Sequence, residues 1–448
     1  MDDPRRVAVI GSGPAGAAAA QTLADAGFSV TVFERDMAIG GRTQTYRADG
    51  YQLDTGAAFI TNFYPRVWGL ATTLGYESEI CQLNRVTGLS HDGRMATLDI
   101  GSPWSFFSFP FVKLVDKLKM LLWTLGLFFK RKTLDIGQPS TLVAYDSETV
   151  SDFVKRTLNE RILDFLVRPG IEPFWYFSCD DVSAGLAAGL TAHAPGARFY
   201  YFKDGIDRVS HHLLAKTTVK TGTTVKSVMS RVGGVRLSIE GEGTTFEQDF
   251  AAVIIATTAN VAVELIGDAW TDLGVDASCH AFIETQRYVA NIHVAFIIER
   301  LAERPQISSL FPVGPGRHSL AALSFHGVKD KNAVSMSHEL ISVYLSDEES
   351  WRLMTLDDET TSRRCYELAQ TVYPNLPDAY SVFKITRRPY AIPIHEVGRY
   401  RKAALVNQGQ KTTSSSVLFC GDYLATATVD GAIHSGQLAA ETLIQRVL

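Results

Sequence analysis

Three glycines near the start of the sequence have the spacing of a phosphate-binding turn. They follow a short apolar run, residues 7–10, and open an alanine-rich stretch that predicts a helix. Glycine lets the backbone turn tightly and approach a pyrophosphate, whose charge is stabilised by the free N–H groups and the dipole at the helix N-terminus. A second apolar run, residues 29–33, ends at an acidic residue placed to bind a ribose hydroxyl. The residues expected to contact a dinucleotide here are Gly11, Gly13, Gly16 and Glu34.

A second glycine pair and a basic residue follow the acid, and they bear on which dinucleotide is bound. Gly40 and Gly41 allow close backbone approach, and Arg42 carries a guanidinium group that can meet a diphosphate. An NAD site needs neither feature, whereas a longer dinucleotide lying across the domain would use both. The spacing therefore favours FAD, with a solvated surface charge as the alternative interpretation of Arg42.

The E-R-x-x-x-x-G-G-R run at residues 34–42 resembles the flavin amine-oxidase superfamily, which includes amine oxidases, protoporphyrinogen oxidases and carotenoid desaturases. Residues 417–436 resemble the closing flavin motif of that superfamily. The resemblance implies that Asp422 accepts hydrogen bonds from ribityl hydroxyls. It also implies that a helix beginning near Asp430 directs its positive end at the flavin pyrimidine carbonyl. Further cofactor contacts implied in this way are Arg35, Gly56, Ala57, Val225, Gly421 and Val429.

Three further segments, residues 148–169, 202–206 and 388–398, are similar to motifs of the protoporphyrinogen oxidase branch. One departure concerns the substrate. Residues 174–177 are four consecutive aromatics where that branch usually has small residues, so they fill space that a macrocycle would need. A hydrophobic small molecule other than protoporphyrinogen is therefore expected.

Two histidines and the aromatic run are the candidates for catalysis and substrate binding. The resemblance places His293 where many amine oxidases carry a lysine that holds a water near flavin N5, and His395 where the oxidase branch commonly has tyrosine. His293 could hold that water or shuttle a proton near neutral pH, but both histidines could equally be structural. The aromatics could grip an apolar substrate or simply form core. The candidates are His293, His395 and Tyr176 for catalysis, and Arg85, Phe174, Trp175 and Phe177 for the substrate pocket.

Residues 103–132 are rich in aromatic and aliphatic side chains and end in a basic cluster. Charged residues interrupt the apolar run, which argues against a transmembrane helix. Two interpretations stay open: a helix that contacts one leaflet of a membrane, and the wall of a tunnel for a hydrophobic substrate.

Composition and patterning define the expected architecture. The chain has 448 residues and a net charge of −5, so nucleic acid is not an expected partner. Five scattered cysteines favour a reducing compartment, the cytoplasm, and no metal site is expected. Cys420 does not lie where amine oxidases carry a flavin-linked cysteine, which favours non-covalent FAD. We predict an α/β plus α+β fold with two interleaved domains. A Rossmann-like FAD-binding domain of the GR2 type, with a mixed sheet, is expected over 1–80, 200–275 and 405–448. A substrate-binding domain of helices and an antiparallel or mixed sheet is expected over 81–199 and 276–404, largely helical over 85–200.

The sequence thus predicts an FAD-dependent oxidase, dehydrogenase or desaturase that removes hydride from a hydrophobic small molecule, with dioxygen or a quinone as acceptor. A flavin amine oxidase is one alternative. A redox-neutral flavin-dependent isomerase or a lipid-binding protein is another. The oligomeric state is left open.

Overall fold

A parallel sheet built from distant parts of the chain forms one half of the molecule. A computed structural model describes residues 5–99, 102–303, 305–316, 318–329 and 337–447. The sheet includes both apolar runs that were predicted as strands near the start of the sequence. All neighbouring strands run parallel. The strand order is β10 (Thr218–Lys220), β2 (Ser29–Phe33), β1 (Arg6–Ile10), β14 (Ala252–Ile255) and β20 (Val417–Phe419).

Both faces of this sheet are covered, as its continuous apolar strands require. Val7 and Val9 pack against one layer of helices, and Ala8 and Ile10 pack against the elements on the other face. The first layer contains α1 (Pro14–Asp25), α2 (Pro65–Leu74), α10 (Arg208–Leu214) and α17 (Val429–Val447). The second contains the antiparallel strands β11 (Thr223–Arg231), β12 (Gly234–Gly241) and β13 (Thr244–Phe250), with α11 (Ala259–Ile266), α12 (Ala277–Glu284) and α16 (Arg399–Thr412).

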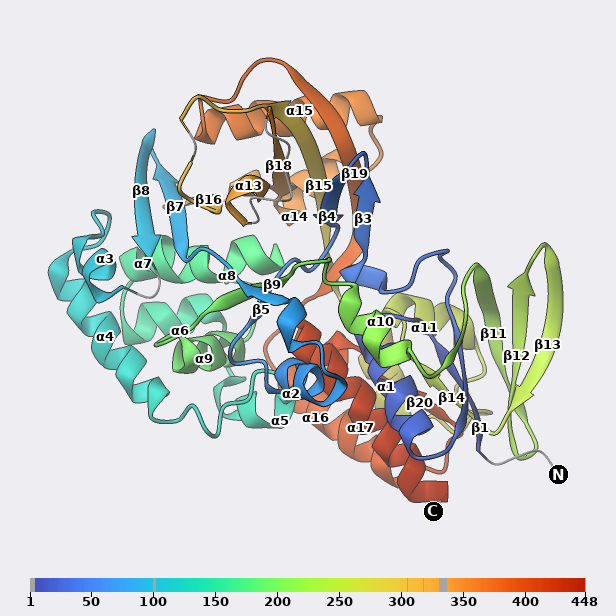
Figure 1. Cartoon of the computed structure of the whole chain (residues 1–448). Helices are drawn as coiled ribbons and strands as arrows, with labels where there is room; N and C mark the ends of the chain where they lie inside the picture. The colour runs from blue at the N-terminus through green and yellow to red at the C-terminus, as the bar shows by residue number, and fades with distance from the viewer. Residues whose placement is uncertain (1–4, 100–101, 304, 317, 330–336, 448) are drawn as a thin grey trace.

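A seven-stranded mixed sheet forms the upper part of the molecule in Figure 1. Alternate residues of its longest central strand, such as Ile292 and Val294, pack beneath α15, while His293 lies on the opposite face. The strand order is β19 (Tyr380–Pro393), β15 (Tyr288–Glu299), β18 (His338–Leu345), β17 (Leu320–Phe325), β16 (Ser309–Pro312), β7 (Val86–His91) and β8 (Arg94–Asp99). Its helices are α13 (His326–Lys329), α14 (Asp347–Leu353) and α15 (Asp358–Val372).

A block of helices lies beside this sheet, on the left in Figure 1. Its members are α3 (Pro103–Ser108), α4 (Leu114–Phe128), α5 (Pro139–Leu142), α6 (Val150–Thr157), α7 (Glu160–Ile162), α8 (Arg168–Trp175) and α9 (Ala184–His193), with one π-helical turn at Leu163–Val167 between α7 and α8. Small sheets join the parts: β3 (Thr45–Ala48) with β4 (Tyr51–Asp54), and β5 (Ile60–Thr61), β9 (Phe199–Phe202) and β6 (Ile80–Gln82). No helix among the described residues combines the length and apolarity needed to cross a membrane.

The mixed architecture agrees with the expected α/β plus α+β fold. The domain boundaries remain a prediction. The chain does return to the parallel sheet three times, since β1, β14 and β20 lie side by side but are separated by hundreds of residues.

Candidate functional site

The glycine turn after β1 has the backbone geometry of a close-approach loop. Gly11 has a positive φ of 103°, and a Cβ there would lie 2.9 Å from the Ala256 carbonyl oxygen. A Cβ on Gly16 would lie 2.0 Å from the Gly11 carbonyl oxygen. Helix α1 begins after Gly13 with no side-chain cap and no acidic residue in its first turn. Its N-terminal N–H groups are therefore directed at a space suited to an anion.

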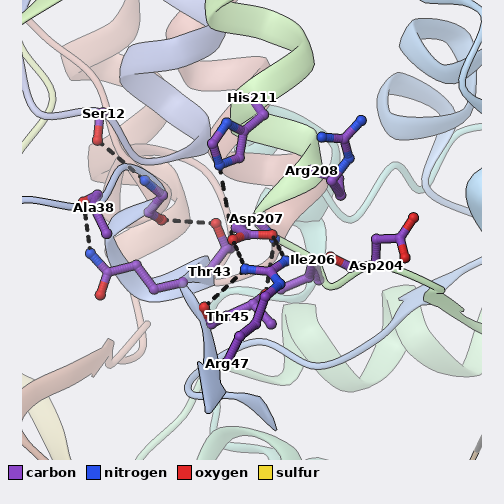
Figure 2. Close-up of polar contacts among 12 residues, drawn as sticks. Ser12, Ala38, Thr43, Thr45, Arg47, Asp204, Ile206, Asp207, Arg208 and His211 are labelled. Atoms are coloured by element: carbon purple, nitrogen blue, oxygen red, sulfur yellow. Dashed lines mark hydrogen bonds and ion pairs between the residues drawn. The ribbon is translucent and has the colours of Figure 1, made fainter. Parts of the chain in front are cut away.

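Glu34 fixes the two glycine turns relative to each other. Its buried carboxylate accepts hydrogen bonds from the backbone N and the Oγ of Ser12, at 2.9 and 2.6 Å. The Ser12 Oγ in turn accepts a hydrogen bond from the N–H of Gly40 at 3.2 Å. Figure 2 shows this contact beside Ala38 and Thr43. The neighbouring Arg35 is exposed and makes only a 3.8 Å ion pair with Asp36.

The second glycine turn and the closing motif meet at an ion pair. The two terminal nitrogens of Arg42 donate to the two carboxylate oxygens of Asp422 at 2.8 and 2.7 Å, and one also donates to the Ala391 carbonyl. Burial opposes the charge of Arg42, but Asp422 outweighs it, so the pKa of Arg42 is raised. Residues 380 positions apart in the sequence, predicted to contact the same cofactor, are thus held in direct contact.

Gly56 and Ala57 lie against the backbone of Arg42. A Cβ on Gly56 would lie 2.0 Å from the Arg42 carbonyl oxygen, which also accepts a hydrogen bond from the N–H of Ala57 at 3.1 Å. This packing leaves no room for a side chain at position 56. The loop after β4 therefore supports the same turn that presents Arg42.

Arg388 adds a second positive charge at this point. Its guanidinium donates to the carbonyl and to the Oγ1 of Thr55, the latter at 3.0 Å. Burial and the charge of Arg42 lower the pKa of Arg388 to about 10. The two guanidinium groups therefore lie close enough for their charges to interact, and the Asp422 carboxylate pairs with that of Arg42. The local excess of positive charge suits a diphosphate.

The first turn of α17 is held by contacts to α2. The buried carboxylate of Asp430 accepts hydrogen bonds from the backbone N–H groups of Arg66 and Val67, at 2.8 and 3.0 Å, and from the Arg66 guanidinium at 2.9 Å. Asp430 therefore caps α2 with its side chain. Val429 is buried beside it, and Val225 is buried in β11 next to a bulge in the pairing with β12.

His293 is the centre of a buried polar and aromatic cluster. Its Nε2 lies 2.9 Å from the Ser342 Oγ, which also lies 2.7 Å from Nε2 of His326. The imidazole stacks on the ring of Tyr344 at 4.2 Å. Burial, together with the charges of His326 and Arg388, lowers the pKa of His293 to about 3. The imidazole is therefore neutral over the physiological pH range, which favours a positioning role over a proton shuttle.

The four aromatics at residues 174–177 end α8 in a left-handed turn. Tyr176 has a positive φ of 63°, and its ring lies 6.4 Å from that of Tyr344, so it is connected to the His293 cluster. The indole N–H of Trp175 donates to the Ala427 carbonyl at 2.7 Å, just before α17. Phe177 is buried and stacks on Trp175, and Phe174 packs among other aromatic rings. The run is therefore both core and a link between α8 and the closing motif.

A cleft of about 130 Å³ lies beside α8 and includes Tyr176 in its wall. Apolar residues such as Val289 and Ile394 line its floor. Carboxylates outnumber guanidinium groups along the remaining wall, and much of the charge of Arg168 is balanced within α8 by Glu172 at 2.6 Å. Of the aromatic stack formed by Tyr176, Tyr344 and His293, Tyr176 lines the cleft. The charged lining residues are Asp164, Arg168, Glu172, Asp181, Arg287, Asp347 and Glu348.

Two other candidates occupy different surroundings. His395 is buried, and its ring stacks on Tyr400 at 5.0 Å. Burial, with the charge of Arg399, lowers its pKa to about 3. Arg85 is partly exposed and pairs with Asp99 at 3.4 Å, where β7 meets β8. Neither arrangement brings them to His293, and their proposed roles remain predictions.

The 202–206 turn is fixed by a polar cluster rather than by the cofactor motifs. Arg47 donates to both carboxylate oxygens of Asp207 and to the Asp204 carbonyl (Figure 2). Gly205 lies against Thr45, because a Cβ there would be 2.4 Å from the Thr45 Oγ1. The cluster joins the hairpin of β3 and β4 to the start of α10.

Sequence reasoning missed four residues of the site: His326, Ser342, Tyr344 and Arg388. Arg388 opens the 388–398 segment, but the other three belong to no short motif. The pairing of β15 with β18 and β19, with α13 directly after β17, brings the four together. Within the described residues, no group of His, Cys, Asp and Glu side chains is arranged to hold a metal ion.

The sequence matches a family model and parts of curated proteins. A sequence model of flavin-containing amine oxidoreductases matches residues 14–444. Protoporphyrinogen oxidase 2 of Arabidopsis thaliana is 30% identical over 169 residues, which are 37% of this chain and 31% of that protein. The alignment thus spans about a third of that curated relative.

Solved structures share the fold over nearly the whole chain. A protein described as a protoporphyrinogen oxidase from Exiguobacterium sp. 255-15 has a TM-score of 0.76 and 15% identity, covering 98% of this chain and 99% of that one. Putrescine oxidase bound to putrescine has a TM-score of 0.72 and 19% identity, covering 98% and 99%. These matches confirm the expected fold class.

Proposed function

We propose, given that the chain belongs to the family of flavin-containing amine oxidoreductases, that it binds FAD non-covalently and oxidises a hydrophobic small molecule by removal of a hydride. The observation that carries the proposal is the contact between Arg42 and Asp422. It joins the glycine turn, which suits a diphosphate, to the strand end expected to bind the ribityl chain.

The residues present fit FAD. Gly11, Gly13 and Gly16 would hold the pyrophosphate at the N-terminus of α1, and Glu34 would face the adenosine ribose. Arg42 and Arg388 supply more positive charge than Asp422 neutralises. FAD, when bound, would supply the acceptor for the hydride, with dioxygen or a quinone as the expected final electron acceptor. Burial raises the pKa of the Cys420 thiol, which disfavours the thiolate needed for covalent attachment.

Around the reacting carbon, the protein would exclude water and fix orientation. A stack of three rings is formed by Tyr176, Tyr344 and His293. Burial is the main cause that raises the pKa of both tyrosines and lowers the pKa of the histidine. Such a desolvated environment suits an apolar substrate. Neutral His293, held by Ser342, would orient a water or a substrate group.

A second candidate is oxidation of an amine, and the cleft beside α8 favours it. Its carboxylates, Asp181, Asp347 and Glu348 among them, would attract a cationic amine toward Tyr176. The two candidates differ in the charge of the substrate, not in the cofactor.

Substrate-dependent bleaching of the flavin absorbance under anaerobic conditions tests the proposal. The purified chain should retain FAD through gel filtration and release it on acid precipitation. Apolar polyenes or polycyclic compounds should bleach it, and dioxygen or a quinone should restore the colour. Bleaching by amines alone would select the second candidate. Failure to bind FAD, or substrate conversion without reduction of any acceptor, would reject the proposed oxidation.

The His293→Ala variant tests the positioning role. We expect lower turnover at normal FAD loading, with no change in the pH dependence between about pH 5 and 8, because this imidazole stays neutral there. His338→Ala, at an exposed position of β18, is the matched control. Turnover by His293→Ala equal to that of the control would exclude the role.

A further inference from the structure

Helix α4 presents an apolar face to solvent. Exposed residues recur along it at the spacing of one helical face and continue just past its end. Leu122 is 70% exposed and Phe129 79% exposed, and Trp104 on the neighbouring α3 is 84% exposed. We call this surface the α4 face, and it consists of Leu114, Val115, Leu118, Leu121, Leu122, Leu125 and Phe129 with Trp104.

Helix α4 buries two charged residues beside the apolar Leu127, and polar contacts hold this side against the protein. Its buried side includes Asp116, whose carboxylate accepts from Asn159 at 2.8 Å. It also includes Lys117, whose Nζ donates to the carbonyls of Phe107 and Phe109, both at 2.6 Å. These polar contacts anchor the helix and fix which side faces outward. The exposed apolar side is therefore a defined surface rather than a loosely packed segment.

The exposed charges within residues 103–132 are all positive. Asp116 is the only acidic residue between positions 103 and 132, and it is buried. The chain as a whole carries a net charge of −5, so the concentration of cations here is local. The exposed cations beside the apolar face are Lys113, Lys119, Lys130, Arg131 and Lys132.

We propose that the α4 face docks on the surface of a lipid bilayer that contains anionic lipids. The apolar side chains would enter the boundary between headgroups and acyl chains, and the flanking cations would contact the headgroup phosphates. Docking of a second copy of the chain through the same face would place two sets of these cations against each other. The charge therefore favours an anionic surface over self-association. Helices α3 and α4 lie at the outer edge of the molecule, where a flat surface can reach them (Figure 1).

Flotation of the full chain with vesicles tests this inference independently of catalysis. Vesicles of phosphatidylcholine alone are compared with vesicles in which one third of the lipid is phosphatidylglycerol. We expect binding to the anionic vesicles that weakens as salt is added. Replacing Lys130, Arg131 and Lys132 by glutamine should weaken binding by about fivefold for each cation removed. The double variant Leu122→Ser/Phe129→Ser should weaken it by at least about tenfold.

Helix α16 supplies matched controls at exposed positions. Leu405→Ser removes an exposed apolar side chain, and Arg401→Gln/Lys402→Gln/Lys411→Gln removes three exposed cations. Both control variants should float with the vesicles as the unmodified chain does. The inference is overturned if the chain does not float, if neutral and anionic vesicles bind equally, or if the controls lose as much binding as the α4 variants. It is also overturned if sedimentation shows a dimer that Leu122→Ser/Phe129→Ser dissociates.

Discussion

Gly436 lies where α17 crosses α1, and a methyl group at this position has no space. A Cβ there would lie 2.0 Å from the carbonyl oxygen of Ala15 and 3.1 Å from the amide nitrogen of Ala19. Real Cβ atoms essentially never come closer than 3.0 Å to another heavy atom, and neither neighbour can rotate away because both belong to a helix backbone. Gly436→Ala must therefore push the two helices apart by about one ångström.

The expected cost follows from this overlap. Overpacking of a well-packed interface costs about 1–3 kcal/mol, and contact with a rigid backbone belongs at the upper end. We expect Gly436→Ala to lower the free energy of unfolding by about 2–3 kcal/mol. Because α1 and α17 carry the two ends of the proposed FAD site, the variant should also retain less FAD after gel filtration.

Gly409→Ala is the matched control for this prediction. Gly409 lies in helix α16, and a Cβ there would meet nothing within 4 Å. Alanine should stabilise that helix by about 0.5–1 kcal/mol. The free energy of unfolding of both variants is measured by urea unfolding followed by circular dichroism. The unfolding midpoints are compared with one shared dependence of free energy on urea concentration. Equal free energies of unfolding for Gly436→Ala and Gly409→Ala would refute the reasoning.

Three further predictions follow from contacts of the site. Asp422→Ala should weaken FAD binding by about 10–100-fold in a fluorescence titration, because hydrogen bonds to a charged group contribute about 1.5–3 kcal/mol. The control variant Asp268→Ala, at an exposed position, should bind FAD as the unmodified chain does. Trp175→Phe removes the donor to the Ala427 carbonyl and should cost about 1–2 kcal/mol of stability in urea; an unchanged midpoint would contradict the importance of this bond. The pKa of His395 is about 3 in the folded chain and about 6.5 when unfolded, so only the unfolded chain takes up a proton between these values. The His395 imidazole therefore lowers the free energy of unfolding by up to about 1.4 kcal/mol for each pH unit below 6.5. In the His395→Leu variant, the free energy of unfolding should fall less steeply between about pH 6 and 4.

Features encoded by short contiguous patterns were predictable. The apolar runs at residues 7–10 and 29–33 become β1 and β2, and the glycine turn between them becomes the N-terminus of α1. Backbone turns and buried strands depend on local residue types, so the sequence alone indicates them. The meeting of Arg42 with Asp422 was anticipated only through a cofactor that both were expected to contact.

Features that depend on strand register were not predictable. His293 lies opposite Tyr344 only because β15 and β18 pair in one particular register, and α13, which begins directly after β17, then brings His326 to Ser342. No spacing along the chain indicates that register. The lowered pKa of His293 also depends on burial, which a histidine in an apolar strand does not by itself establish.

The side of a helix that faces solvent was equally hidden. Residues 103–132 are visibly apolar and basic in the sequence, and two interpretations fitted that composition. The structure buries Asp116 and Lys117 and exposes Leu122 and Phe129, and the proposed docking on a lipid bilayer rests on this exposure. A pattern of residues defines two faces of a helix, but only tertiary contacts decide which one is covered.

The order of strands in the parallel sheet has a consequence for how the protein is synthesised. β20 and α17 leave the ribosome after every other strand of this sheet, because β20 is the last of them in chain order. Until then the edge of β14 is unpaired, and Arg42 lacks its carboxylate partner. An open strand edge invites pairing with other chains, so a nascent or truncated chain that lacks this last segment is prone to aggregate. A chain without this segment would also lack Asp422 and with it one end of the proposed FAD site.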